Sequence, residues 1–147
     1  MTRVNCAIPV KYLTDEHLIA EHCELEMLPY FHQKAIESGS IRDIPEKFTL
    51  GKGHILFFVN KMGFVRKRYR MVHKECKRRG FGVQNREDKW KGISEKYMND
   101  YNPTPEARKI LLERIIERIS NSPKKNFRYM GENISKEEAI EKLKQLN

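Results

Sequence analysis

The sequence predicts an all-α fold: a single compact domain of three main helices with long irregular connections and a short extra helix near the C-terminus. Three observations support this prediction. Apolar residues recur at helical spacing in three long segments, residues that favour helix starts precede them, and no strand-like alternation or internal repeat competes. At 147 residues the chain can bury a core but is too short for two comfortable domains.

The first main helix is expected to begin at Asp15, because a threonine suited to the N-cap precedes it and acidic residues fill its first turn. Pro29 lacks the backbone N–H that a helix interior requires. We therefore expect this helix to end or kink near Leu28 before it resumes towards Lys34. Glycines and a proline between residues 39 and 53 indicate a loop after it.

The second main helix is predicted between Gly53 and Arg79, where apolar residues show the strongest helical periodicity of the chain. Its other faces carry lysine and arginine, and Gly80 is suited to end it. Residues 82–103 lack a clear period and are expected to form an irregular connection with short helical turns at most.

The third main helix is expected to start at Pro105, after the cap residue Thr104, and to stop before Pro123. A capping box that begins at Ser135 predicts the short final helix, whose apolar side extends to Leu146.

Composition favours a polyanionic partner, because Lys and Arg outnumber Asp and Glu by 29 to 20, which gives a net charge of +9. No apolar run approaches the length of a membrane span and no signal peptide is evident, so we expect a soluble intracellular protein. Cys6, Cys23 and Cys76 are widely spaced and odd in number, which predicts reduced thiols. We interpret all three as small core residues.

The N-terminal residues suggest a reactive amine. Thr2 is small enough for the preceding Met1 to be removed, and Arg3 would place a cation beside the amine that removal frees. An α-amino group has a pKa of about 7.7–8.0, so a useful fraction is unprotonated at neutral pH, unlike lysine at about 10.4. Such an amine can attack a sugar carbon and form an imine.

Titratable groups recur in the first helix, where His17, Glu21 and Glu24 at i, i+4 and i+7 are predicted to share one face. From spacing alone this stripe favours a solvated helix face with a His–Glu pair, and a catalytic role needs more than spacing. A metal site that uses His17, His22 and Cys23 is disfavoured because the last two are adjacent and point differently. No metal ligand set, phosphate-binding loop or nucleophile elbow is expected.

Seven short segments carry a family resemblance through their order and separation: Thr2–Asn5, Asp15–Glu21, Glu24-Leu25, Leu50–Phe58, Phe64–Arg68, Arg79–Phe81 and Asp100–Pro103. Together they resemble the pyrimidine-dimer DNA glycosylase family, also called phage-type endonuclease V. The resemblance covers nearly the whole chain, as far as about Gly131. It implies a glycosylase and lyase domain at residues 1–131, and it leaves residues 132–147 as a C-terminal helical extension packed on or trailing that domain.

The resemblance implies a bifunctional DNA glycosylase and apurinic/apyrimidinic (AP) lyase that needs no cofactor or metal and acts as a monomer on damaged duplex DNA. In this family pattern the freed amine of Thr2 attacks C1′ of the damaged nucleotide and forms an imine with the opened sugar. Glu24 matches the catalytic carboxylate, Arg3 would bind phosphate, and His17 would orient Glu24 or a phosphate. The chain departs from the pattern at Cys23 and Met27, where family members typically carry arginines.

Two alternatives stay open: the enzyme could act on another lesion, such as an AP site or a deaminated or oxidised base, or the protein could be a non-catalytic DNA-binding module. Apart from the catalytic pair of Thr2 and Glu24, the residues expected at the DNA are Arg3, His17, Glu21, His22, Arg66, Arg70, Lys74, Arg114, Arg118, Arg128 and Tyr129.

Overall fold

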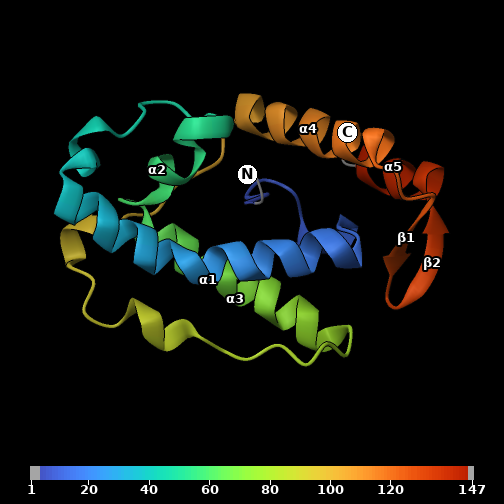
Figure 1. Cartoon of the computed structure of the whole chain (residues 1–147), viewed down its shortest axis with the longest axis horizontal. Coiled ribbons are helices and arrows are strands. Elements are labelled where there is room, and N and C mark those ends of the chain that lie inside the picture. Colours follow the sequence, from blue (N-terminus) through green and yellow to red (C-terminus); the bar gives the residue numbers. More distant parts are fainter. Residues whose placement is uncertain (1–3, 146–147) are drawn as a thin grey trace.

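The computed structural model describes residues 4–145, whose arrangement is shown in Figure 1. Its main helices are α1 (Asp15–Ser38), α3 (Met62–Arg78) and α4 (Pro105–Asn121). The smaller elements are α2 (His54–Phe58), the strands β1 (Asn126–Tyr129) and β2 (Glu132–Ser135), and α5 (Lys136–Lys144). The all-α fold class is confirmed, since helices make up most of this structure and its sheet is small.

The helix α1 lies across the middle of the molecule, with α3 packed against it and α4 beside α5 along another edge (Figure 1). One hydrophobic core joins all the main helices, and Leu18 and Leu25 of α1, Tyr69 of α3 and Ile119 of α4 are at most 1% exposed. Phe127 of β1 and Leu143 of α5 belong to the same core. The C-terminal segment is therefore packed on the rest of the chain.

The predicted helix starts are confirmed by their caps. The side chain of Thr14 accepts a hydrogen bond from the backbone N–H of His17, and Thr104 and Ser135 do the same for α4 and α5. Helix α4 ends at Asn121, before the proline, as predicted. Gly80 follows α3 with a φ of 87°, a left-handed conformation that suits a C-terminal stop.

Of the two alternatives predicted at Pro29, a helix end near Leu28 is wrong, because α1 continues through the proline to Ser38. A kink there stays a prediction. A proline inside a helix costs about 3 kcal/mol. Buried residues on both sides of it, Leu25, Leu28 and Ala35 among them, offset that cost, since each fully buried leucine contributes about 1.5–3 kcal/mol. Core packing therefore outweighs the local preference.

The single helix predicted from Gly53 to Arg79 is also wrong, since the chain turns between α2 and α3 at residues 59–61. The carbonyls freed by this break have new partners. Lys61 donates from Nζ to the carbonyl of Phe57 at 2.8 Å, and Nδ1 of the buried His32 lies 2.6 Å from the carbonyl of Val59. The apolar period continues through the break, which is why the pattern alone did not reveal it.

The hairpin of β1 and β2 was not predicted. Its turn is Met130-Gly131, and both residues have positive φ angles, 56° and 82°, as the favoured two-residue hairpin turns require. Phe127 points into the core while its neighbours are exposed. The strands are only four residues long, so the alternation is too short to stand out in the sequence.

The connection at residues 82–103 is irregular with short helical turns, as predicted, and it is tied to the start of α3. The buried Trp90 donates from Nε1 to the carbonyl of Met62 at 3.1 Å. A Cβ atom on Gly63 would lie 2.4 Å from the carbonyl oxygen of Met98, so only glycine allows this close approach.

The cysteines are free thiols, but their positions correct one expectation. Cys6 and Cys76 are buried, whereas Cys23 is exposed on the outer side of α1. Thr2 and Arg3 lie outside the described residues, as does Leu146.

Candidate active site

A pocket of about 470 Å³ lies between the first turns of α1 and the second half of α4, and we call it the α1/α4 pocket. It brings together three residues that the sequence predicted at the DNA: His17, Arg114 and Arg118. Cations outnumber the one carboxylate in its wall, so it suits an anionic ligand. The lining residues are Asn5, Glu16, His17, Ala20, Arg114, Ile115, Arg118, Ser122, Lys124 and Phe127.

His17 is a neutral side chain in this pocket at neutral pH. Its Nδ1 lies 2.6 Å from Oγ1 of Thr14, and its ring stacks on Phe127 with centroids 5.9 Å apart. Burial lowers the pKa of His17 from 6.5 to about 4, and the nearby Arg118 and Lys124 act in the same direction against the carboxylate of Glu16. The residue therefore offers the pocket hydrogen bonds rather than charge.

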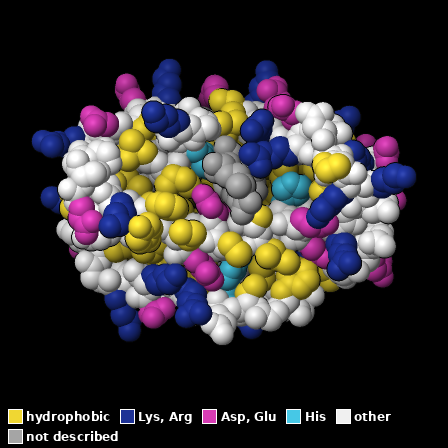
Figure 2. Space-filling view, in the orientation of Figure 1, with side chains coloured by type: hydrophobic (Ala, Val, Ile, Leu, Met, Phe, Trp, Pro, Cys, Tyr) yellow, Lys and Arg dark blue, Asp and Glu magenta, His cyan; other side chains and the backbone are white. Residues whose placement is uncertain are grey.

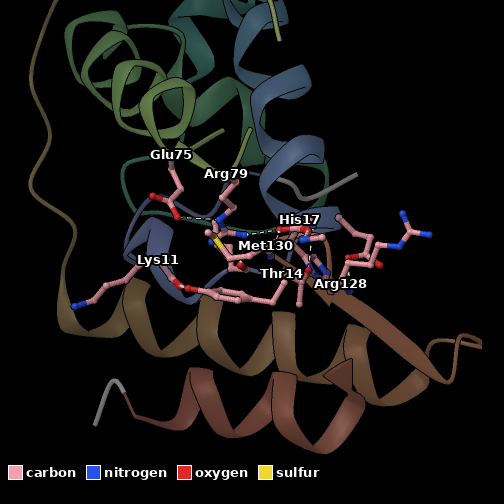
Figure 3. A network of polar contacts seen from close by, with 12 residues as sticks. Lys11, Thr14, His17, Glu75, Arg79, Arg128 and Met130 are labelled. Carbon is pink, nitrogen blue, oxygen red and sulfur yellow. Dashed lines mark hydrogen bonds and ion pairs between the residues drawn. The ribbon is translucent and has the colours of Figure 1, made fainter. Parts of the chain in front are cut away.

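A buried polar network fastens the hairpin to the start of α1 (Figure 3). The carboxylate of Asp15 accepts hydrogen bonds from the backbone N–H groups of Met130 and Gly131, at 3.0 and 2.8 Å, and from Nη1 of Arg79 at 2.9 Å. Arg79 also donates to Glu75 at 2.8 Å. Because the hairpin carries Phe127, this network fixes one wall of the α1/α4 pocket.

Glu24 lies one helical turn beyond Ala20, which lines the pocket, and its side chain is half-buried. Within residues 4–145 its carboxylate makes no hydrogen bond or ion pair, and none joins it to His17. The expected orientation of Glu24 by His17 is therefore not seen.

Glu21 does not share the pocket-facing side of α1 with His17 and Glu24, as the spacing suggested. Its side chain is fully buried on the stripe of Leu18 and Leu25, and it accepts two hydrogen bonds from Arg68, at 2.7 and 2.9 Å. Arg68 also donates to the carbonyl of Ile8 at 2.9 Å. Since no surface of Glu21 reaches solvent, the expectation of a direct DNA contact is corrected to a role in the core.

His22 is buried as well, at 2% exposure. Its Nε2 lies 3.0 Å from Nδ1 of His73, its Nδ1 lies 3.3 Å from a carboxylate oxygen of Glu26, and its ring packs on Tyr69. Burial lowers the pKa of His22 below its ordinary value. These contacts hold α1 on α3, and they replace the predicted DNA contact.

The cations predicted on α3 lie away from the pocket, because α3 packs against a different side of α1 than α4 does (Figure 1). Arg70 forms a two-bond ion pair with Glu87, at 2.7 and 2.6 Å. Arg66 is half-buried, and Lys74 is exposed. None of the three lines the α1/α4 pocket, so their contact with DNA stays a prediction.

The two hairpin residues predicted at the DNA, Arg128 and Tyr129, differ in their surroundings. The side chain of Arg128 is exposed, and its backbone N–H donates to Glu16 at 3.0 Å. Tyr129 donates from its hydroxyl to the carbonyl of Lys11 at 2.8 Å, and its ring lies between the cations of Arg79 and Lys142, 4.5 and 4.2 Å from its centroid. Tyr129 therefore helps to fix the hairpin, while Arg128 can reach a ligand.

Sequence reasoning missed Asn5, Lys124 and Phe127 as pocket residues. The cluster of cations after the third helix could have suggested Lys124. Asn5 belongs to the resemblance segment Thr2–Asn5, and Phe127 adjoins the predicted residues Arg128 and Tyr129, so both had a signal in the sequence. A larger pocket of about 810 Å³, near the start of α4, is lined in part by Arg108, Lys109 and Lys144 and contains no predicted site residue. Its cations also outnumber its one carboxylate, so the α1/α4 pocket differs from it in holding the predicted residues His17, Arg114 and Arg118 rather than in charge or size.

Two negative findings apply to the described part of the chain. No group of three His, Cys, Asp or Glu side chains is placed to hold a metal ion, and no helix is long and apolar enough to cross a membrane.

Comparison with known protein families gives a match to the family described as pyrimidine dimer DNA glycosylase, over residues 1–89. The matched part contains α1, α2 and α3, with Glu24 and His17, whereas Arg114, Arg118 and the hairpin lie beyond it. The match includes more than half of the chain and agrees with the segments that first suggested this family. The chain belongs to the pyrimidine dimer DNA glycosylase family.

Proposed function

We propose that this protein excises a damaged base from duplex DNA and then cuts the strand, as a combined glycosylase and AP lyase. The nucleophile is the α-amine of Thr2 after removal of Met1, and Glu24 is the carboxylate that assists it. One copy of the chain acts without a metal ion or cofactor, since the amine itself forms the bond to the sugar.

One observation carries the proposal: Asn5 lines the α1/α4 pocket together with His17 and the arginines of α4. Three residues of extended chain span at most about 10 Å, so an amine on Thr2 is confined to the neighbourhood of this pocket. Glu24 lies one turn along α1 from the same wall. This short reach from Asn5, together with the position of Glu24, supports a site that combines the amine, the carboxylate and a cationic pocket for phosphate.

The chemistry follows from these groups. The amine nitrogen bonds to C1′ as the bond from C1′ to the base breaks, and the base leaves with the electron pair and takes up a proton. Opening of the sugar then gives an imine at C1′. Loss of the C2′ proton and departure of the 3′ phosphate complete a β-elimination that cuts the strand. Glu24 stabilises the positive charge that develops on the sugar and accepts the C2′ proton.

DNA binding relies on Arg114 and Arg118, which lie one turn apart on α4 in the pocket wall. Each cation that neutralises a phosphate adds to the salt dependence of binding. Replacement of either arginine by glutamine should lower the slope of log K against log salt by about 1. Lys74→Gln on α3 is the matched comparison, and an equal effect there would move the interface to α3.

Reductive trapping tests the proposed chemistry. Duplexes with a single thymine dimer or a single AP site are incubated with the protein and borohydride, and intact mass spectrometry establishes whether Met1 is absent. We expect a covalent adduct on both duplexes from protein that begins at Thr2. Protein that retains Met1 should give none. An adduct of equal yield from Met1-retaining protein would refute the amine assignment.

Glu24→Gln separates binding from chemistry. We expect it to bind the dimer duplex as the wild type does but to lose strand cleavage, because the amide carries no negative charge and accepts no proton. Glu113→Gln, which changes an exposed carboxylate on α4, is the control and should cleave normally. Normal cleavage by Glu24→Gln would remove this residue from the mechanism.

A further inference from the structure

The outward side of α1 is apolar, although a helix on the surface of a globular protein usually places charged residues there. Ala20, Cys23, Met27 and Tyr30 follow one another at spacings of three, four and three residues, so they form a continuous line that we call the outer ridge. Met27 is 44% exposed and Tyr30 is 55% exposed. No charged residue belongs to this line.

The helix α3 shows the usual arrangement and serves as an internal comparison. Its exposed positions include Arg70, Lys74 and Lys77. Met71 is the exposed large apolar residue on α3, at 50%, and it has charged neighbours. The outer ridge has charged neighbours too, since Nζ of Lys34 lies 5.5 Å from the ring centroid of Tyr30, but its four members are continuous. It therefore differs from a single scattered apolar residue, which needs no explanation.

The outer ridge begins at the candidate site. Ala20 is part of the wall of the α1/α4 pocket, and Met27 follows Glu24 by three residues, so it lies on the next turn of the same helix. Beyond Met27, a second hollow of about 530 Å³ is lined by Met27, Tyr30 and Lys89 together with Glu26 and Pro29.

Cations flank the outer ridge on two sides. Arg114 and Arg118 of α4 lie towards the pocket, and Lys89 lies on the other side. Figure 2 shows apolar side chains gathered over the C-terminal half of α1, with both basic and acidic side chains around them. Glu24 and Glu26 also adjoin the outer ridge, but four cations, Lys34, Lys89, Arg114 and Arg118, outnumber these two carboxylates. This charge distribution fits a polyanion whose backbones run along the flanks. It disfavours a second copy of the chain, since that would bring like charges together.

From this geometry we infer that the outer ridge is a wedge for the bases of duplex DNA, with Met27 entering between stacked base pairs beside the lesion and Tyr30 supporting it. The inference rests on the proposed function. Apolar side chains inserted from the minor groove unstack base steps and bend the duplex, and the lost stacking is least costly where a lesion already weakens it. Met27 would then open the duplex so that the damaged sugar reaches the amine.

The test compares Met27→Ala with the matched control Met71→Ala. Borohydride trapping rates are measured on duplex DNA and on single-stranded DNA, each with one AP site, and 2-aminopurine beside the site reports unstacking in the duplex. We expect Met27→Ala to lose about tenfold in rate on the duplex, together with the fluorescence rise, and to match the wild type on the single strand. Met27→Leu should restore the duplex rate, and Met71→Ala should leave every measurement unchanged.

The outcomes distinguish the wedge from the proposed function. A Met27→Ala protein with normal duplex rate and fluorescence would overturn the wedge while the proposed function stands. An equal loss on single-stranded DNA would also overturn it, because the residue would then serve the chemistry itself. Sedimentation showing a wild-type dimer that Met27→Ala dissociates would assign the ridge to self-association. Absence of any trapped adduct from the wild-type protein that begins at Thr2 would refute the proposed function instead.

Discussion

Replacement of Glu21 by glutamine tests whether this carboxylate stabilises the core or contacts DNA. Glu21 and Arg68 have side chains that are 0% and 3% exposed, and two hydrogen bonds of 2.7 and 2.9 Å join them. Removing one partner of such a pair costs about 3–5 kcal/mol, because it leaves the other charge buried without compensation. Glutamine keeps the shape and one acceptor oxygen, so we expect the low end, about 3 kcal/mol.

Urea unfolding followed by circular dichroism measures this cost directly. In a thermal unfolding experiment, the same loss of about 3 kcal/mol should lower Tm by about 10 °C in a chain of this size. Glu113→Gln is the control for an exposed carboxylate and should change stability by less than about 0.5 kcal/mol. The double variant Glu21→Leu with Arg68→Met should recover much of the loss, since both charges are gone.

The same variant tests the DNA role that spacing had suggested. If Glu21 serves only the core, the folded Glu21→Gln protein should bind DNA with the salt slope of the wild type. Stability within about 0.5 kcal/mol of the wild type, combined with altered DNA affinity, would refute the reasoning from burial.

Three further predictions follow from buried groups. Burial lowers the pKa of His17 from 6.5 to about 4, so between pH 6.5 and about pH 4 the unfolded chain binds one more proton than the folded chain. The free energy of unfolding, measured by urea unfolding at several pH values, should therefore fall by up to about 1.4 kcal/mol per pH unit on acidification across this range. In His17→Gln this fall should be smaller. Burial raises the pKa values of Cys6 and Cys76 to about 12 and 11, whereas Cys23 is exposed. A thiol reagent should therefore label only Cys23 quickly in the native protein, and all three thiols in denaturant. Fast labelling of a second thiol in the native protein would contradict the core packing. Asp15→Asn should speed amide exchange in the hairpin turn by at least about tenfold, while amides in the middle of α3 stay protected, because the turn loses its ionic acceptor.

Helix starts were predictable from the sequence because the cap signals are local. Thr14, Thr104 and Ser135 each bond a backbone N–H three residues ahead, and no distant contact is needed. Pro29 was misjudged because its effect depends on the core around it. The break between α2 and α3 at residues 59–61 was not predicted. One of the contacts that stabilise it, between His32 and the carbonyl of Val59, joins residues that are distant in sequence, so the local pattern does not indicate it.

The candidate site was predictable in its chemistry but not in its walls. Residue types and the family resemblance singled out His17, Glu24 and the arginines of α4. The spacing of His17 and Glu21 could not reveal that they face different surroundings, because four residues correspond to 400° of rotation and leave an offset of about 40°. With that offset, His17 lines the α1/α4 pocket whereas Glu21 is buried in the core.

The bonds of Asp15 also determine when the pocket can exist. Its partners lie 64, 115 and 116 residues away in the chain, so the two bonds to the hairpin turn cannot form before residues 130 and 131 are present. Contacts of such long range form late in folding, after the loop-closure entropy has been overcome. A chain that emerges from the ribosome from its N-terminus therefore carries Thr2 and Glu24 long before it has the hairpin that completes the pocket. The wall that Phe127 gives to the α1/α4 pocket can therefore be held in place only after residues 130 and 131 have been synthesised.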